Sequence, residues 1–296
     1  MRSNACWNTE TQTHITMSTI LACTDGSLYA PSIYQHAAWG ASRGGASIHV
    51  LHVIERDESP DQQDLSGSIG FDANAELLEE LARHDESHAR IARLRGKAIL
   101  EDAAKQLAGH EVKTTQRHGS VVETLDEFEA GAELVIVGKR GEHTDFAKGH
   151  LGSNLERVVR SAKIPVLVAA REFKPMERFL VAFDGGPSSL RAVHHVATQP
   201  WLKGLECHLV MCGKQDREHE LSLEHAAAGL RGAGFTVTAD LLAGDPDEWI
   251  AREVTRRNIG LLVMGAYGHS RVRNLILGST TTHLIRTCLI PILLFR

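Results

Sequence analysis

The sequence predicts an α/β protein made of two tandem, doubly wound parallel-sheet domains with five strands each. Three observations predict this fold: an internal repeat, short apolar runs separated by longer amphipathic segments, and the lack of apolar–polar alternation within each run. Strands that are apolar without alternation are typical of parallel sheets with helices on both faces. Each copy of the repeat is therefore expected to be Rossmann-like.

The repeat is found by comparing the chain with itself at an offset of 159 residues. Both copies open with an apolar run that ends in Asp-Gly, at Asp25 and at Asp184. At the same offset His49 matches His208. Near the end of each copy, at a smaller offset, the apolar runs 134–138 and 164–168 match 261–265 and 290–294. The chain is thus predicted to hold two copies of one unit.

The predicted domains cover residues 17–172 and 177–296, and a charged stretch with Pro175 joins them. Between the Asp and the glycine after its fourth strand, the first copy is 32 residues longer than the second. We place most of this excess in an inserted segment around 55–86, a loop followed by a long helix. The first 16 residues precede any periodic pattern, so Met1 and Met17 both stay candidate starts.

Each element of the second copy follows from its hydrophobic pattern. Apolar runs predict strands near 179–183, 206–211, 235–241, 260–264 and 290–295. Amphipathic segments predict helices near 187–199, 217–232, 246–257 and 279–288. Two helix starts have local signals, a capping box from Ser120 to Glu123 and a capping Asp245 before a proline. We expect the apolar last strands to pair the two copies.

Composition and charge exclude several function classes. The net charge of −5 and an aromatic content of 5% argue against a nucleic-acid partner. No apolar run approaches the roughly 18 residues that cross a bilayer, and the polar start lacks the apolar stretch of a secretory signal. Five cysteines without a C-x-x-C pair fit reduced, buried thiols. We expect a soluble, cytoplasmic protein without membrane contacts.

Ligands of doubly wound sheets bind beyond the carboxyl ends of the strands, where the strand order reverses. There the second copy carries Gly265-x2-Gly268, nine further residues, and then Gly278, Ser279, Thr280 and Thr281. Glycines let a ligand approach the backbone, and the free N–H groups of a helix N-terminus attract phosphate. Taken singly, each glycine is explained by a turn of the chain, and Ser279 is explained by a helix cap, without any ligand. Together, after the fourth strand of a repeated unit, they favour a phosphate site.

This spacing, Gly-x2-Gly-x9-Gly-Ser with an Asp after the first strand, resembles the adenine-nucleotide signature of the universal stress protein family in its tandem form. The resemblance covers about Met17 to Arg296 and implies a stress-response regulatory protein that binds ATP, ADP or AMP, with Mg²⁺ as an option. The resemblance implies that Asp184 and the backbone near Cys212 contact the adenosine, and that Met264 and Gly265 lie against the ribose. It further implies that Gly268 leaves room for the phosphates and that Gly278, Ser279 and Thr281 bind them. The helix start itself, without the resemblance, adds the Thr280 hydroxyl as a donor.

The first copy departs from this pattern in its loop. It keeps Asp25 and Val53, and its glycines and serine stand at Gly138, Gly141, Gly152 and Ser153, with ten residues in place of nine after Gly141. Asn154 and Leu155 replace the two threonines. Acidic residues in the loop repel phosphate, and basic residues such as Lys139 offset them. We expect nucleotide binding by the second copy and leave binding by the first copy open.

Three function classes stay open. The first is a regulatory module that binds an adenine nucleotide. The second is an enzyme that slowly cleaves ATP, although the chain has no P-loop, no nucleophile elbow and no identifiable catalytic base. The third is an adaptor whose sites stay empty and which contacts an unknown protein partner. The sequence leaves open whether two chains form a homodimer.

Two further features are candidates for functional sites: the histidines as metal ligands and the inserted helix as a partner surface. His49 and His52 lie three apart on a strand and so face opposite sides of the sheet. His84 and His88 face the same way on the inserted helix, where a solvated face explains them as well as a metal does. We predict no metal site. Apolar residues recur at helical intervals between Leu77 and Leu107, and we favour packing within the protein over a partner surface.

Overall fold

The computed structural model describes residues 18–55, 71–139, 153–267 and 277–296. Within these residues, ten strands form one sheet in the order β3-β2-β1-β4-β5-β10-β9-β6-β7-β8. The strands are β1 (Thr19–Cys23), β2 (Ser47–Ile54), β3 (Val112–His118), β4 (Ala132–Gly138), β5 (Val166–Ala169), β6 (Arg178–Phe183), β7 (Glu206–Cys212), β8 (Val237–Leu242), β9 (Leu261–Gly265) and β10 (Ile292–Phe295). The helices are α1 (Ala30–Gly44), α2 (Phe71–Gln106), α3 (Val121–Phe128), α4 (Ser153–Ser161), α5 (Pro187–Thr198), α6 (Arg217–Gly232), α7 (Pro246–Arg256) and α8 (Ser279–Thr287), with a short 3-10 helix at Pro200–Leu202.

The sheet consists of two parallel halves that meet at their last strands. Strands β1 to β5 pair parallel in the first half, and β6 to β10 pair parallel in the second. At the junction β5 and β10 run antiparallel, and Leu167 is paired with Leu293. The predicted α/β fold class and the predicted pairing through the last strands are both confirmed. The domain limits of 17–172 and 177–296 stay a prediction.

Helices cover both faces of the sheet, which explains the even apolar character of the strands. One buried cluster takes side chains from α1, α2, α5 and α6, and the other from α3, α4, α7 and α8. Each cluster runs from one half into the other across β5 and β10. The two copies therefore share continuous cores on both faces.

The predicted helix starts are observed. The Ser120 hydroxyl accepts the Val122 N–H at 3.2 Å at the start of α3. The Asp245 carboxylate accepts the Asp247 N–H at 2.8 Å before α7. Each cap satisfies a backbone donor that has no partner inside its helix.

Helix α2 holds much of the length that distinguishes the first copy. It has 36 residues, against 16 in its counterpart α6. Its C-terminal part packs on the sheet through Leu100 and Ala103, and Leu107 directly after the helix is buried as well. Earlier apolar side chains are exposed, namely Leu77, Leu81, Ile91 and Leu94. The prediction that α2 packs within the protein is thus confirmed only for its C-terminal part.

Candidate functional site

The predicted site of the second copy lies where the strand order of that half reverses, between β6 and β9. In register, Ala182 of β6 is paired with Met264 of β9, and Phe183 of β6 with Met211 of β7. Asp184, Cys212 and Gly265 come just after these pairs. The fold therefore brings these three predicted residues to one edge of the sheet, at its topological switch point.

Asp184 is held by the turn that leads into α5. Its Oδ1 accepts the Gly186 N–H at 2.8 Å and the Ser189 hydroxyl at 2.6 Å. Gly185 has φ +76°, the same value as Gly26 in the first copy. Left-handed backbone of this kind favours glycine, which accounts for the repeated Asp-Gly. The turn fixes the Asp184 carboxylate next to the first turn of α5.

Gly265 lets α5 approach the end of β9. A Cβ placed there would lie 2.8 Å from the Ser188 Cβ, closer than two side chains pack. Met264, the residue before it, is buried. Close packing against α5 thus explains Gly265 without any ligand, a reason that was not predicted from the sequence. Its place near a ribose stays a prediction.

The two ends of the glycine-rich loop are joined at their base. The Gly278 N–H donates to the Ala266 carbonyl at 3.1 Å. The buried Thr281 hydroxyl lies 3.3 Å from both the Gly265 and the Ala266 carbonyl oxygens. Thr281 thus ties the start of α8 to the end of β9. Gly268 lies outside the described residues.

The first turn of α8 presents backbone donors at this edge. Thr282 makes the first N–H contact within the helix, to the Gly278 carbonyl at 2.9 Å. The N–H groups of Ser279, Thr280 and Thr281 have no acceptor among the described residues. The first turn holds no acidic side chain, and Ser279 is exposed. Three N–H groups at the positive end of a helix dipole form a natural anion site.

Cys212 closes the site on the β7 side. Burial raises the pKa of its thiol to about 11, so the group is a neutral thiol at physiological pH. A neutral thiol is a poor nucleophile, which fits the prediction of a structural cysteine.

The first copy assembles the same edge differently. Asp25 Oδ1 accepts the Ser27 N–H at 2.9 Å, and Val53 lies near the end of β2. A Cβ on Gly26 would lie 2.6 Å from Ile99 of α2, whereas the nearest atom to a Cβ on Gly185 is the Ser222 hydroxyl oxygen at 3.4 Å. Helix α2 thus covers this turn with a bulkier side chain.

The loop of the first copy is described only at its ends. Gly138 ends β4, and Ser153 opens α4. Gly141 and Gly152 lie outside the described residues. Lys139, predicted to offset negative charge in this loop, donates from Nζ to the carbonyl of Cys288, after the end of α8. It thereby links the two copies.

Sequence reasoning missed Glu55, whose carboxylate reaches the first turn of α4. Its Oε2 accepts the Asn154 amide at 3.0 Å, and its Oε1 lies 3.6 Å from Arg157. The position matching Glu55 at the repeat offset is Lys214, which is exposed. A comparison of charges between the copies would have found both residues. A carboxylate beside the helix start opposes a phosphate, and an ammonium favours one.

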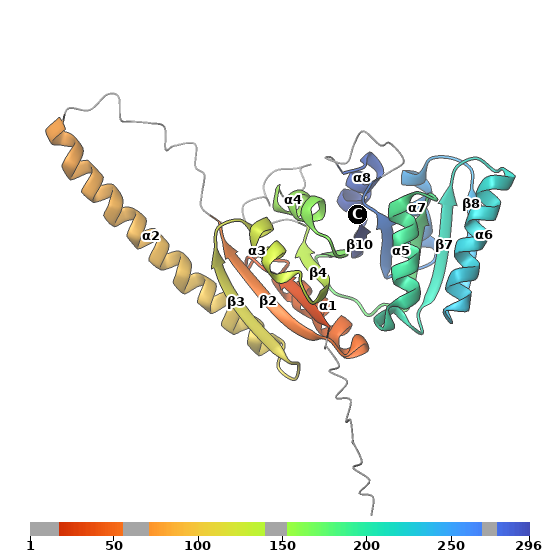
Figure 1. Ribbon diagram of the computed structural model, residues 1–296, viewed down its shortest axis with the longest axis horizontal. Helices are drawn as coiled ribbons and strands as arrows, with labels where there is room; N and C mark the ends of the chain where they lie inside the picture. Colours follow the sequence, from red (N-terminus) through yellow and green to blue (C-terminus); the bar gives the residue numbers. More distant parts are fainter. Residues whose placement is uncertain (1–17, 56–70, 140–152, 268–276) are drawn as a thin grey trace, which may run out of the picture.

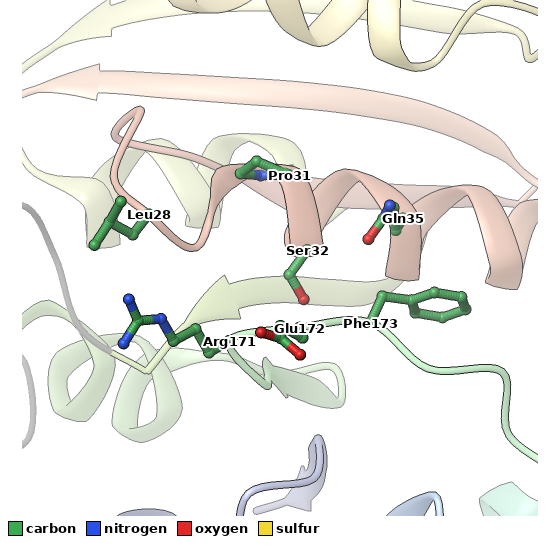
Figure 2. Close-up of a pocket in the computed structure, with 7 residues that line it drawn as sticks. All are labelled: Leu28, Pro31, Ser32, Gln35, Arg171, Glu172 and Phe173. Carbon is green, nitrogen blue, oxygen red and sulfur yellow. The ribbon is translucent and has the colours of Figure 1, made fainter.

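A separate hollow of about 420 Å³ lies between the start of α1 and the segment after β5. Figure 2 shows Leu28, Pro31, Ser32 and Gln35 facing Arg171, Glu172 and Phe173. The Ser32 hydroxyl donates to the Ala170 carbonyl at 2.7 Å and so holds the two walls together. None of the seven lining residues belongs to the predicted site.

The histidine predictions can be followed in the described part of the chain. His49 Nε2 lies 2.8 Å from the Thr115 hydroxyl, and His52 Nδ1 lies 2.8 Å from the Thr24 carbonyl. His49 packs against Phe128 of α3 and His52 lies beside α2, so the two do face opposite sides of the sheet. The described residues contain no cluster of three or more His, Cys, Asp or Glu side chains suited to a metal. No described helix is both long and apolar enough to cross a membrane.

Comparison with known proteins decides the family. The chain matches the model of the Universal stress protein family over residues 17–170 and 211–296. The chain belongs to the universal stress protein family. It is 39% identical over 287 residues to universal stress protein Slr1230 of Synechocystis, covering 95% of this chain and 100% of that protein.

Two further relatives fit the tandem organisation of this universal stress protein. Universal stress protein G of Salmonella typhimurium is 31% identical over 136 residues, which is 45% of this chain and 84% of that protein. A crystal structure of a universal stress protein from Archaeoglobus fulgidus matches with a TM-score of 0.68 and 21% identity, covering 94% of this chain and 98% of that one. The fold of the whole chain is therefore shared with a solved member of the family.

Proposed function

We propose that this universal stress protein is a stress-response regulator that binds an adenine nucleotide at the β6/β9 edge of its second copy. The observation that carries the proposal is the set of three N–H groups at the start of α8, which have no acceptor among the described residues. Phosphate oxygens are the ligands that such a helix start attracts. The choice of an adenine nucleotide rests on the family signature in the sequence.

The surrounding charges support the second copy over the first as the binding copy. The start of α4 has Glu55 beside it, which accepts the Asn154 amide and is partly offset by Arg157 at 3.6 Å. The start of α8 has the buried Thr281 hydroxyl on its inner side, and Lys214 stands at the position that matches Glu55. A negative ligand is repelled by the carboxylate and attracted by the ammonium. We propose one nucleotide per chain.

The nucleotide acts in this proposal as a signal. Asp184 and Cys212 contact the adenosine, Met264 and Gly265 the ribose, and Ser279 to Thr281 the phosphates. We assign no residue as a catalytic base, and Mg²⁺ enters only as a companion of the phosphates. Any ATP cleavage is then slow, because the site stabilises charge without a group that activates water.

A substitution that removes one backbone donor tests the site directly. Ser279→Pro deletes the N–H of the first helical residue, a position where proline is well accepted. Gly278 has φ −57° and ψ 147°, the extended conformation that a residue before proline prefers. We expect Ser279→Pro to weaken ATP binding by about tenfold or more, the cost of one charge-assisted hydrogen bond, in a calorimetric titration.

Ser279→Ala is the matched control, because it removes the hydroxyl and keeps the N–H. It should retain most of the affinity. Both variants should keep the circular dichroism spectrum and the melting temperature of the wild-type chain. Equal affinity of Ser279→Pro and the wild type would refute the assignment of the site to this helix start.

A nucleotide-independent adaptor is the second candidate function. The continuous sheet and the cores shared across β5 and β10 favour it, because they make a rigid platform without any ligand. Nucleotide binding separates the two candidates: an adaptor of this kind neither retains nucleotide through purification nor responds to added ATP.

A further inference from the structure

The first part of α2, residues 77–95, is a helical arm that stands away from the rest of the protein. Every residue from 79 to 91 is exposed, and Figure 1 shows this part of α2 running outward past β2 and β3. The helix leaves the sheet at Gly96, where a Cβ would lie 2.6 Å from His52 Cδ2. Helices in open solvent are only marginally stable, because most helical stability in proteins comes from packing of an amphipathic face. We therefore expect the arm to be stabilised by packing against another helix.

One side of the arm has the spacing of a coiled-coil seam. Leu77, Leu81, His84, His88 and Ile91 follow one another in alternating steps of four and three residues. The side chains are accessible, since the relative exposure is 47% for Leu81 and 60% for Ile91. The centroids of the two imidazole rings lie 4.1 Å apart, with a tilt of 32° between the rings, so both side chains point the same way. This spacing is the one that packs knobs into holes on a second helix.

The charges of the arm are divided between its two ends. Residues 79–86 hold four acidic side chains and one basic side chain, Arg83, which pairs with Glu79 at 2.6 Å. Residues 87–97 hold four basic side chains and no acidic one. An identical helix laid antiparallel brings the acidic end of each arm onto the basic end of the other. A parallel arrangement brings like charges together.

We propose that the α2 arm is a dimerisation element that pairs antiparallel with the arm of a second copy of this chain. The seam is self-complementary about the point midway between His84 and His88. In that register Leu81 lies opposite the partner's Ile91, and His84 lies opposite the partner's His88. A neutral imidazole has one donor and one acceptor, so each facing pair forms a hydrogen bond. A polar layer inside an apolar seam fixes the register of coiled coils.

The length of the arm keeps the two protein bodies apart. In this register Gly96 of one chain lies about 30 Å along the helix axis from the partner's Gly96, at a rise of about 1.5 Å per residue. Each body then sits at the far end of the paired arms. The pairing uses none of the residues assigned to nucleotide binding, so it stands or falls independently of the proposed function.

The molar mass of the full chain in solution tests the pairing. We expect a dimer for the wild type across a range of protein concentrations, measured by light scattering or sedimentation equilibrium. The variant Leu81→Gln with Ile91→Gln should be a monomer, because the apolar seam is lost while glutamine maintains the helix. The control is Leu190→Gln with Leu221→Gln, which replaces two comparably exposed leucines on α5 and α6 and should leave the dimer intact.

Cysteine cross-linking tests the direction of pairing. The variant Leu81→Cys with Ile91→Cys places each new thiol opposite its counterpart on the partner in the antiparallel register, so a short bismaleimide should join the chains. Neither single variant should cross-link above the background set by the five native cysteines. Efficient cross-linking of Leu81→Cys alone would show parallel pairing and overturn the register.

Two further results would overturn the proposal itself. One is a wild-type chain that is monomeric in solution, which would mean that the arm binds a different protein and not a second copy of this chain. The other is a dimer that persists after Leu81→Gln with Ile91→Gln, which would place the contact elsewhere. Circular dichroism of the variants distinguishes loss of pairing from loss of the fold.

Discussion

His36 and His195 occupy equivalent positions in the two copies and are both kept neutral by their surroundings. His36 packs against Phe173 and His195 against Phe295, each at a ring centroid distance of 5.0 Å. Burial lowers the pKa of each imidazole from 6.5 to about 4. The two phenylalanines stand at different positions of their copies, one after β5 and one in β10, yet both contacts favour the uncharged ring.

These histidines make the stability of the protein depend on pH. Between pH 6.5 and about 4 the unfolded chain binds protons that the folded chain does not, so the free energy of unfolding falls as the pH falls through this window. The double variant His36→Leu with His195→Leu should flatten that slope. Urea unfolding at several pH values measures it, and an unchanged slope in the variant would show that other groups cause the dependence.

At the scale of single residues, the sequence predicted part of the site. The repeated Asp-Gly was visible because it recurs near the start of each copy, and the glycine spacing because it recurs after the fourth strand of each copy. The fold brings Asp184, Cys212 and Gly265 to one sheet edge. The role of Thr281 as a tie to the Gly265 and Ala266 carbonyls was not predictable, because a threonine in a first turn looks like any other phosphate donor. Glu55 carries no periodic signal, and only its charge opposite to that of Lys214 at the matching position marks it in the sequence.

Between elements, one buried carboxylate joins α7 to two strands. Glu253 accepts from Arg256 at 2.7 Å and from Arg257 at 2.6 Å. Arg257 also reaches Asp240 of β8 at 2.7 Å and His208 of β7 at 3.0 Å. The hydrogen bonds from Arg256, assisted by those from Arg257, lower the pKa of Glu253 to about 2. The network fixes the end of α7 against the sheet.

We expect Glu253→Gln to lower the free energy of unfolding by about 2 kcal/mol, because hydrogen bonds to a charged group are the strong ones. The contribution of the carboxylate is complete above its ordinary pKa of 4.5 and is lost as the pH falls toward about 2. Chemical denaturation at neutral pH measures the loss. Glu224→Gln is the control, since its pair with Arg231 is exposed and worth little. Equal losses for the two variants would contradict this account of the network.

The elements themselves were largely predictable, with one exception. The strands and helices of the second copy lie within about two residues of their predicted bounds, because apolar runs and amphipathic periods report directly on a two-faced parallel sheet. The exposed half of α2 was not predictable as exposed. An apolar stripe shows which side of a helix seeks a partner, and it does not show whether the partner lies in the same chain.

In the whole molecule, the two copies form one ten-stranded sheet with cores that cross the junction. The antiparallel contact of β5 with β10 covers two apolar strand edges that each copy alone would expose. The two similar sheet edges differ at one charged position: Glu55 of the first copy, which lies 3.6 Å from Arg157, is matched by the exposed Lys214 in the second copy. This difference favours the second copy as the binding copy, whereas the proposal of nucleotide binding rests on the N–H groups at the start of α8.

The most direct measurement of the central claim is the identity and amount of nucleotide bound by the full chain. The protein, purified and also incubated with ATP, is freed of unbound ligand and denatured, and the released molecules are identified and quantified by mass spectrometry. We predict one adenine nucleotide per chain. Release of none, both from the purified chain and after incubation with ATP, would contradict the account and leave a duplicated fold that acts without nucleotide.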